Sequence, residues 1–545
     1  MSLEFVEESF TEGERAVLAP HFTNLDGPVF ALVDLPEVVK GALFARYSRS
    51  AKSLRRLFLD EFAQDAERPS GSASPEAVGV QRAEKLYERV FFEFGDDSVA
   101  QLGGVHLACE QASQLLAKVL EWGRLAAYLE QSTRYVPYDD RPGGRWRYQV
   151  PDEVLAAGAD LANRYRTSLD RAFETYARWL GPLQVFFRDL YPKSPEESDF
   201  VYRMTIRAKA CDTLRALLPA ATRSNVGIFA TAQAYEQLIL RMRADGLSEV
   251  RVYAGLILAE LRKVIPAFLT RVDLPDRGGL WSEYIHRTRE DTAAVAGELL
   301  SGVVAEPRSE VTLSDFDPDG EIKVVAAALY AVSELPDDQL MDEARKMSFE
   351  ERTRILQAYV GERLNRRHRP GRAFERTSYR FDVLCDYGAF RDLQRHRLLT
   401  MEWQTLSPTH GFEVPPEIEA AGALSDWNAV LEDSAALYET MAEAGLAKVA
   451  QYAVSMAYRI RFYMDMNARE AMHLIELRTT PQGHPVYRRV CQQMHRLIAE
   501  QAGHRAIAEA TRFADHSRVE LERLEAERRT EAKRRAVNRD YRDRS

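Results

Sequence analysis

The two halves of the chain follow the same order of segments, and this is the strongest constraint that the sequence places on the fold. In each half, helical stretches precede a short arginine motif, and a long apolar helix follows it. The plan predicts a diverged internal duplication, with a first copy at 1–302, including an N-terminal extension, and a second at 322–515. The spacing of the motifs differs between the halves, so one copy carries an insertion.

Polar segments separate and flank these copies. Residues 303–321 are acidic and contain two prolines and the turn sequence DPDG, so we expect them to be a linker. Residues 516–545 are dominated by charged side chains, which predicts a solvated C-terminal tail. Residues 64–78 are rich in Pro, Ser and Gly and predict a loop.

Most long segments show the periodicity of helices. Apolar side chains recur every three or four residues over 112–132, 234–265 and 468–501, which predicts helices there. Strand-like alternation is rarer and is clearest at 377–387. Residues 98–109 are compatible with a matching strand or with a helix. The expected fold class is α+β, rich in helices with a modest sheet.

Charge and cysteine content exclude several classes of protein. The chain has 73 Lys and Arg against 83 Asp and Glu, a formal net charge of −10, so neither nucleic acid nor a membrane surface is an expected partner. The N-terminus is acidic and apolar runs fall short of the ~20 residues of a membrane span, so we expect a cytoplasmic protein. The four cysteines lie far apart, which predicts reduced core thiols, and no metal site is expected.

The most informative motif is the run RDLQRHR at 391–397, directly after the predicted strand. Arginine presents a planar fork of donors and histidine can change tautomer or charge, so this cluster suits a phosphate or pyrophosphate group. A solvated start of a helix is the alternative interpretation.

A second motif reads EQSTRY at 130–135. The Ser132 hydroxyl and the Arg134 guanidinium suit the phosphate of a nucleoside monophosphate, and Glu130 can accept from a ribose or base N–H. An ordinary ion pair at the end of a helix is the alternative.

A third motif reads NAREAMHLIELR at 467–478. Asn467 and Arg478 are eleven residues apart, almost three helical turns, so they share a face. An apolar ridge flanked by polar groups fits the edge of a cofactor, and it also fits a plain amphipathic helix.

Together and in this order, the motifs resemble the flavin-dependent thymidylate synthases. The triplet at 395–397 is similar to the opening of that family's RHRxxSxNExSxRY signature, and residues 123–138 (GRLAAYLEQSTRYVPY) resemble its remainder. Residues 453–478 resemble the family's C-terminal helix with its NxR and terminal LR. The resemblance spans roughly 80–285 and 322–500 and implies two tandem copies of the family's domain, with small antiparallel sheets.

Each copy has lost what the other retains. At the RHR position the first copy has Trp122, Gly123 and Arg124, but it keeps the EQSTRY residues. The second copy keeps RHR but has Trp403 at the position of the signature's Glu and Ser407-Pro408 at Arg-Tyr. The family's phosphate-binding arginine matches Arg215 in the first copy, whereas the second has Gln451. Since family members are homotetramers, the resemblance implies a homodimer that forms a pseudo-tetramer with hybrid sites.

The resemblance also implies an activity. The family methylates dUMP to dTMP, taking the methylene from methylenetetrahydrofolate and reducing equivalents from NADPH through bound FAD. Arg478 would be the catalytic residue, placed at the pyrimidine. The flavin would be held by Glu375, Arg395, His396, Arg397, Asn467, Arg469 and His473. His368 matches the partner of Glu375 only with a short insertion. The nucleotide would be held by Glu130, Ser132, Arg134, Arg215 and Gln394.

Two alternatives stay open from the sequence. One is a diverged paralogue that binds FAD or a nucleotide without catalysing methyl transfer, because the signature is damaged in both copies. The other is a scaffold or nucleic-acid-associated protein without flavin, which would use the arginine-rich clusters and the charged tail.

Overall fold

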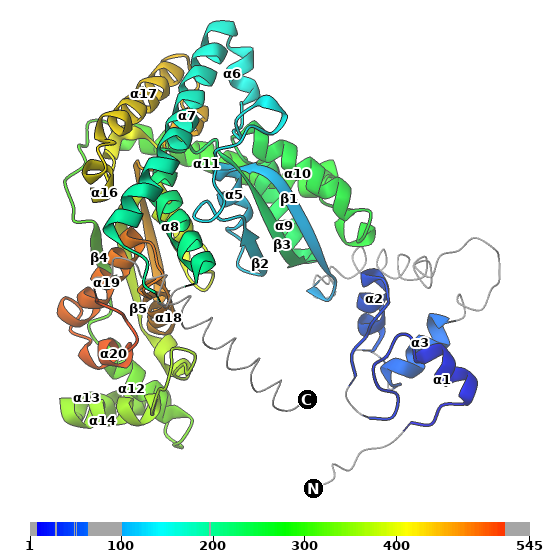
Figure 1. Ribbon diagram of the computed structural model, residues 1–545. Coiled ribbons are helices and arrows are strands. Elements are labelled where there is room, and N and C mark those ends of the chain that lie inside the picture. Colours follow the sequence, from blue (N-terminus) through cyan, green and yellow to red (C-terminus); the bar gives the residue numbers. More distant parts are fainter. Residues whose placement is uncertain are drawn as a thin grey trace, which may run out of the picture. The chain divides into compact units, whose positions relative to one another are not determined.

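The computed structural model describes residues 8–27, 30–47, 50, 52–63, 101–195 and 198–517. The loop expected at 64–78 and the tail beyond 517 lie outside these residues. The chain separates into two compact units (Figure 1). The first unit comprises 1–109, 125–129 and 226–303, and the second comprises 110–124, 130–225 and 304–545. The second unit therefore combines segments of both halves of the sequence.

A four-stranded antiparallel sheet lies in the second unit, in the order β4-β5-β7-β6. Its strands are β4 Val311–Phe316, β5 Ser378–Asp386, β6 Thr400–Trp403 and β7 Arg459–Asn467. β5 and β7 pair along their whole length, with Phe381 opposite Met464. The strand expected at 377–387 is confirmed, because the alternate side chains from Tyr379 to Cys385 are buried.

β4 lies inside the acidic segment 303–321 that the sequence predicts to be a linker. Val311 and Leu313 are buried, whereas Ser314 and Asp315 are exposed. An antiparallel edge strand needs only one buried face, so two apolar side chains suffice and the surrounding charges conceal the alternation. The linker prediction is therefore wrong for these residues, which form the edge of the sheet.

Helices from both halves of the sequence build the rest of the second unit (Figure 1). α18 Ala468–Arg478 packs against β5 and β7, and α19 Pro485–Glu500 packs against β4 and β5. From the first half, α7 Ala159–Leu190 packs against α8 Asp199–Leu214 and against α17 Leu424–Glu443. The other helices of this unit are α5 Gln114–Leu120, α6 Asp152–Ala156, α12 Gly320–Tyr330, α13 Asp337–Lys346, α14 Phe349–Val360, α15 Tyr387–Leu393, α16 Pro416–Ala420 and α20 Arg505–Ala510.

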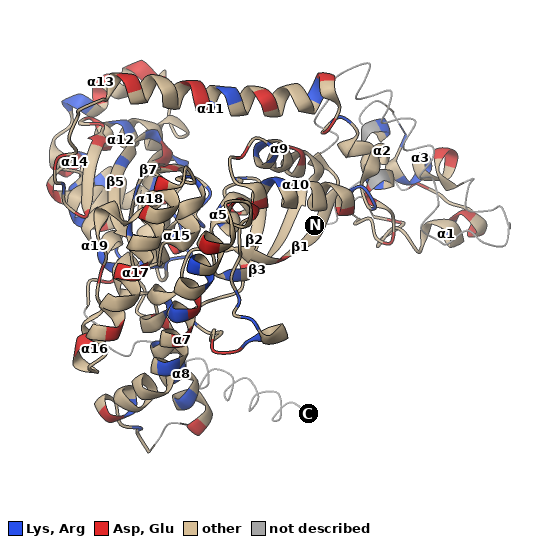
Figure 2. Ribbon diagram, turned by 90° about the horizontal axis from the view of Figure 1, so that it is seen from above, with Lys and Arg blue, Asp and Glu red and all other residues tan. Residues whose placement is uncertain are grey.

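The first unit consists of helices and part of a second sheet. Its helices are α1 Glu12–Leu18, α2 Glu37–Tyr47, α3 Leu54–Glu61, α9 Ala232–Arg243, α10 Ser248–Leu261 and α11 Leu280–Leu299. The sheet has the order β1-β3-β2, formed by β1 Gly104–Ser113, β2 Ala126–Glu130 and β3 Arg223–Thr231. α11 is exposed along most of its length and carries acidic and basic side chains in turn (Figure 2). No helix among the described residues is long and apolar enough to cross a bilayer.

The predicted helices are confirmed at 468–501 and only partly elsewhere. Residues 234–265 form two helices, α9 and α10, broken after Arg243. Residues 112–132 were expected to form one helix, but they form α5 and then β2. Leu125 and Leu129 create the misleading helical period, although both side chains are largely exposed. The open alternative at 98–109 resolves as strand from residue 104 onward.

The cysteines behave as the sequence predicts. All four are buried and free of disulfides. Burial raises the pKa of Cys109 to about 11 and that of Cys491 to about 12, so neither thiol is ionised near neutral pH. They are core side chains without nucleophilic character.

We expect the second unit to depend on one buried ion pair. Arg363 donates to both carboxylate oxygens of Glu476 on α18 at 2.6 Å, and both side chains are almost fully buried. Glu476→Gln removes the negative charge and leaves the Arg363 cation buried without its counter-ion, which costs about 3–5 kcal/mol. Urea unfolding followed by tryptophan fluorescence measures this, with Glu419→Gln on the exposed face of α16 as a control that shifts the midpoint little. Equal midpoints for the two variants would contradict the assignment.

Candidate functional site

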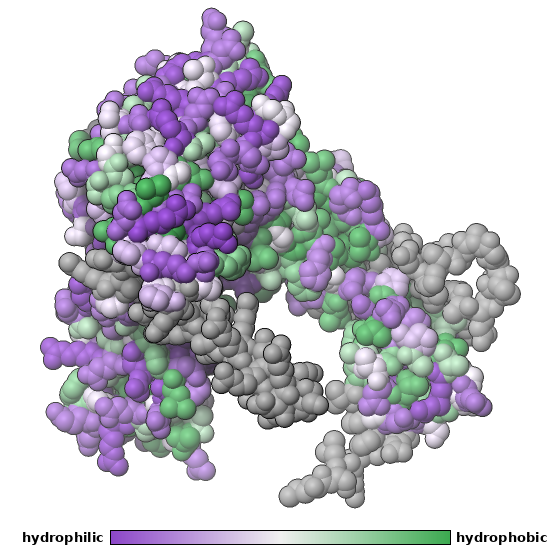
Figure 3. Space-filling model, viewed as in Figure 1, coloured by the Kyte–Doolittle hydropathy of each residue, from purple (hydrophilic) through white to green (hydrophobic). Residues whose placement is uncertain are grey.

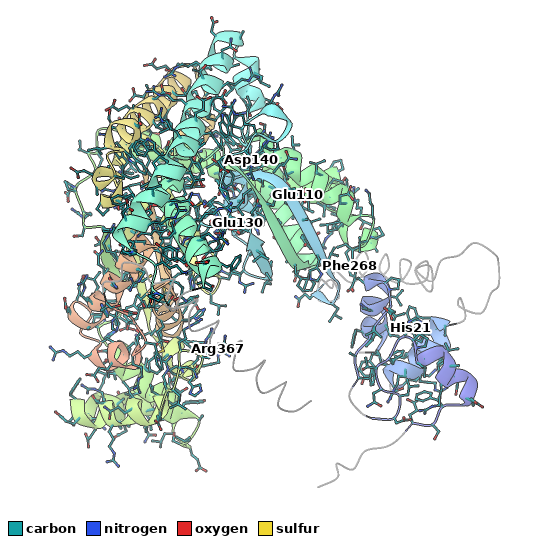
Figure 4. All side chains as sticks on the ribbon, in the orientation of Figure 1. His21, Glu110, Glu130, Asp140, Phe268 and Arg367 are labelled. Carbon is teal, nitrogen blue, oxygen red and sulfur yellow. The ribbon has the colours of Figure 1, made fainter. Side chains whose placement is uncertain are left out.

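Glu130, at the end of β2, binds two arginines of the RDLQRHR motif (Glu130 is labelled in Figure 4). Arg391 Nη2 donates to Oε1 of Glu130, and Arg395 Nη2 donates to Oε2 at 2.6 Å. Burial by itself would raise the pKa of Glu130, but Arg391, Lys118 and Arg395 lower it to about 2. Glu130 is thus ionised, and both of its oxygens are engaged by residues of the other half of the sequence.

Asp212 of α8 binds Arg134 of the EQSTRY motif. Its Nε and Nη2 donate to the two oxygens of Asp212, each at 2.9 Å, in a bidentate pair. Its Nη1 donates to the hydroxyl of Tyr487 on α19 at 3.2 Å. Asp212 also lies 3.3 Å from Nε of Arg215, so one carboxylate serves two arginines of the expected nucleotide site.

Asp392 repeats this arrangement from the second half of the chain. Its oxygens lie 3.5 Å from Nη1 of Arg215 and 3.6 Å from Nη1 of Arg395. Burial opposes the ionisation of Asp392, but Arg395, Arg215 and Arg478 hold its pKa far below the ordinary value. Asp392 is therefore a permanent anion between arginines of the two halves.

Arg478, at the end of α18, contacts His396. Its Nε donates to Nε2 of His396 at 3.0 Å, and its guanidinium lies 5.6 Å from the ring centre of Tyr487. Nδ1 of His396 lies 3.1 Å from Oε1 of Glu470. Both ring nitrogens of His396 are therefore engaged by protein groups, while the two Nη atoms of Arg478 have no hydrogen-bond partner among the described residues.

The four arginines that the sequence assigned to two copies thus lie in one network. Arg134 and Arg215 share Asp212, Arg215 and Arg395 share Asp392, and Arg134 and Arg478 both contact Tyr487. With Arg391 the network holds five arginines, four of which pair with its three ionised carboxylates, whereas Arg478 pairs with none. The excess of positive charge suits an anionic ligand such as a phosphate group.

Two other predicted flavin residues, Arg469 and Glu375, contact each other. Nη1 of Arg469 lies 3.4 Å from Glu375, and its Nε donates to the carbonyl of Pro370 at 2.9 Å. Asn467 caps α18 by accepting from the N–H of Glu470 at 2.9 Å. Arg397 is exposed and makes no ion pair with the described residues.

Three other predicted residues bind groups of the protein itself. The amide of Gln394 is buried and donates to the carbonyl of Lys118 at 2.9 Å, so its side chain is part of the packing. Ser132 Oγ accepts from the N–H of Arg134 at 3.2 Å. His368 Nδ1 accepts from the N–H of Leu364 at 3.3 Å and forms neither a hydrogen bond nor an ion pair with Glu375, which the structure also describes.

His396, Glu470 and His473 form a cluster whose ligand atoms lie within 4.8 Å of one another. Such a set could hold a metal ion, but its lone pairs are taken. Arg478 donates to Nε2 of His396, and Arg369 donates to Nδ1 of His473 at 3.1 Å. His396 then carries its proton on Nδ1, and His473 carries its proton on Nε2. Both N–H groups are donors, so they suit the carboxylate of Glu470 as an acceptor. Burial lowers the pKa of His473 to about 4, so this ring is neutral near pH 7.

A cavity adjoins the network on the side of Arg215. It encloses about 840 Å³, including its open mouth, and its lining includes Asp212, Arg215, Asp386 and His484. Nη2 of Arg215 and Oδ2 of Asp386 are buried without a hydrogen-bond partner among the described residues. Burial raises the pKa of Asp386 to about 7. A free donor of a site arginine beside a cavity is consistent with a ligand-binding role.

Each copy has a tryptophan at the signature position where the other copy has a charged residue of the Arg395–Glu130 pair. Trp122 stands where Arg395 stands in the second copy, and Trp403 stands where Glu130 stands in the first. The two rings meet edge to face with centres 5.7 Å apart, and Trp122 Nε1 donates to the carbonyl of Met401 at 3.2 Å. An aromatic contact has thus replaced the Arg395–Glu130 ion pair.

Sequence reasoning missed the carboxylates and aromatic groups that organise these arginines: Asp212, Asp392, Glu470, His484 and Tyr487. The available signals were weak. Asp212 lies one helical turn before Arg215, and Asp392 lies inside the RDLQRHR motif. Nothing in the sequence distinguishes Glu470 and Tyr487 from other polar residues of amphipathic helices.

We expect Glu130 to link stability to pH. Its pKa is about 2 in the folded protein, below the ordinary value of a glutamate, so its contribution is complete above about pH 4.5 and is lost as pH falls through about 2. Glu130→Gln should lower the free energy of unfolding by about 3 kcal/mol at pH 7, and less at pH 3. Urea titrations of both proteins at the two pH values measure the difference. A gap that does not shrink at pH 3 would contradict the assignment.

Comparisons with known proteins find relatives over most of the chain. The family "Thymidylate synthase complementing protein" matches residues 42–267 and 312–503. A UPF0159 protein of Chlamydia muridarum is 38% identical over 532 residues, covering 96% of this chain and 99% of that one. The UPF0159 protein Ta1429 of Thermoplasma acidophilum is 30% identical over 514 residues, covering 90% and 97%.

One solved structure shows a limited likeness. A UMP/dUMP methylase, PolB from Streptomyces cacaoi bound with 5-Br dUMP, is 20% identical with a TM-score of 0.31, covering 39% of this chain and all of that one. The double match of the family at 42–267 and 312–503 accounts for the repeated plan of the sequence. The chain therefore belongs to the thymidylate synthase complementing protein family, as a member with two copies of the family's region.

Proposed function

We propose that this protein methylates dUMP to dTMP, using methylenetetrahydrofolate as the carbon donor and NADPH as the reductant through bound FAD. One observation carries the proposal: arginines that the family's pattern divides between a nucleotide site and a flavin site converge in a single network within one chain. An excess of buried positive charge is what a nucleotide phosphate requires.

In this proposal the nucleotide phosphate binds Arg134, Arg215 and the Ser132 hydroxyl. Arg134 and Arg215 now pair with Asp212, and the phosphate would add to or replace these pairs. Arg478 would lie at the pyrimidine, where its free Nη atoms stabilise negative charge as it develops on the ring during bond formation at C5.

The residues also fit a phosphate-rich cofactor beside Arg478. Four arginines act electrostatically on Glu470 or His473: Arg366, Arg369, Arg397 and Arg469. Arg367, in the same segment, is exposed (Figure 4). These cations would hold the pyrophosphate of FAD, with Asn467 and Glu375 at its edge. The flavin, when bound, supplies the reducing equivalents for the methyl group.

We infer that the functional protein is a homodimer that forms a pseudo-tetramer. Large apolar side chains are exposed on the first unit, and Figure 3 shows hydrophobic residues gathered around α10 and β3. Among them, Val252 and Leu256 of α10 and Phe229 of β3 are about half exposed. A second copy of the chain would cover such a patch.

A second candidate is a nucleotide- or flavin-binding protein that has lost methyl transfer. The observation that favours it is the tight pairing of the phosphate-binding arginines with carboxylates, above all the bidentate pair of Arg134 with Asp212. A phosphate must compete with these internal anions, which weakens binding.

Release of tritium from [5-³H]dUMP distinguishes the two candidates. When a methyl group forms at C5, the hydrogen of that carbon is lost to water, so a synthase releases tritium only when both methylenetetrahydrofolate and NADPH are present. Arg478→Ala should lower the release by at least ten- to a hundred-fold, because a charge-assisted contact contributes about 1.5–3 kcal/mol, and should leave flavin bound. Nucleotide and flavin binding by wild type without release would favour the second candidate.

A matched pair of variants tests the flavin assignment. Arg397→Ala should release flavin from the purified protein, as measured by its absorbance, because an exposed cation is removed from the cofactor region. Arg345→Ala, an exposed cation of α13, should keep it. If neither variant affects flavin content, the cofactor residues are assigned wrongly.

We expect one flavin per chain and a particle of two chains. The contact of Trp122 with Trp403 occupies the position of the second ion pair, so this copy of the site lacks the charges that a phosphate needs. Flavin absorbance per polypeptide and light scattering after size exclusion measure both numbers. Two flavins per chain, or a monomer, would contradict the proposal.

A further inference from the structure

Two buried side chains, His396 and Glu470, form a chain of contacts that ends at Arg478. Its Nε donates to Nε2 of His396 at 3.0 Å, and Nδ1 of His396 lies 3.1 Å from Oε1 of Glu470. His396 and Glu470 are almost completely buried. Glu470 lies two helical turns before Arg478 on α18, so one helix carries both ends of the chain of contacts.

The hydrogen bond from Arg478 is compatible with only one tautomer of His396. A guanidinium nitrogen carries hydrogen and has no acceptor capacity, so Nε2 of His396 must be the acceptor. The proton of the neutral imidazole then resides on Nδ1, and Nδ1–H donates to Glu470. Burial, followed by the repulsion of Arg478, Arg369 and Arg397, holds the pKa of His396 well below its ordinary value, so the ring is neutral.

We propose that Glu470 is a positioning residue that fixes the Nδ1–H tautomer of His396 and, through it, the orientation of the Arg478 guanidinium. With Nε bound to His396 and one face over the Tyr487 ring, the plane of the guanidinium is set, and both Nη atoms remain available. This inference rests on the proposed function only for the ligand of Arg478, which is the pyrimidine of dUMP. The tautomer itself is a property of the protein without ligand.

The neighbouring groups support the same arrangement. Arg369 donates to Nδ1 of His473, so His473 carries its proton on Nε2. Glu470 thus lies between two imidazoles that can offer N–H groups to it. Because Glu470 lacks any arginine partner by hydrogen bond among the described residues, the imidazoles are its principal partners.

Nitrogen-15 NMR of protein with labelled histidine tests the proposal directly. His396 is identified as the resonance that disappears in His396→Gln. We expect long-range proton–nitrogen correlations of the Nδ1–H tautomer, unchanged between pH 6 and 8. The Nε2–H tautomer, which prevails for histidine in water, or titration in this range would overturn the proposal.

Variants of α18 separate positioning from mere stability. Glu470→Ala should abolish the Nδ1–H pattern, whereas Glu470→Gln should keep it, because the amide oxygen still accepts. Ile475→Ala, a buried apolar truncation on the same helix, should also keep it. Retention of the pattern in Glu470→Ala, or its loss in Ile475→Ala, would contradict the role of Glu470.

Kinetics provide the second readout. Glu470→Ala should lower kcat for dUMP at least ten-fold and change its KM less than about three-fold, since the variant keeps the phosphate-binding arginines, and Glu470→Gln should recover most of the rate. An unchanged kcat would overturn the link to Arg478. If wild type shows the Nδ1–H tautomer but no turnover with dUMP, the proposed function fails and the positioning of Arg478 stands.

Discussion

Two buried carboxylates, Asp212 and Asp392, hold the candidate site together. Buried guanidinium groups are tolerated only when anions lie beside them. Asp212 serves Arg134 and Arg215, and Asp392 serves Arg215 and Arg395. Ion pairs also join the two halves of the sequence, because Arg215 lies beside Asp392 and because Arg391 and Arg395 bind Glu130. These pairs hold segments of both halves together in one compact unit.

The two copies have diverged in a physically complementary way. Where Glu130 and Arg395 form a buried ion pair, the corresponding residues Trp403 and Trp122 form an aromatic contact. Burying charged side chains costs desolvation free energy. An ion pair carries this cost and keeps its charges available to a ligand, whereas an aromatic pair avoids the cost. This difference supports the proposal of one charged site per chain, with an apolar contact at the corresponding position of the other.

The same ion pairs create a tension that bears on function. Arginines already paired with Asp212 and Asp392 bind a phosphate less tightly than free ones, and the bidentate geometry of Arg134 makes its pair hard to displace. Arg478 differs, because its Nε is engaged by a neutral imidazole and its Nη atoms have no partner among the described residues. The network thus combines arginines that are paired with carboxylates and one arginine, Arg478, that has no carboxylate partner by hydrogen bond among the described residues.

The sequence determined the fold class, strand β5, helices α18 and α19, and the arginine clusters, because periodicity and local chemistry are written in neighbouring residues. It misjudged 311–316, where charges conceal a one-sided edge strand, and 126–130, where two exposed leucines imitate a helix. Only the tertiary structure identified Asp212, Asp392, Glu470 and Tyr487 as partners of the arginines. Arg395 and Glu130 are 265 positions apart, and Arg134 and Tyr487 are 353 apart. No local sequence pattern predicts such pairs, because they form only when distant segments pack together. A buried charge is then stable only beside an opposite charge.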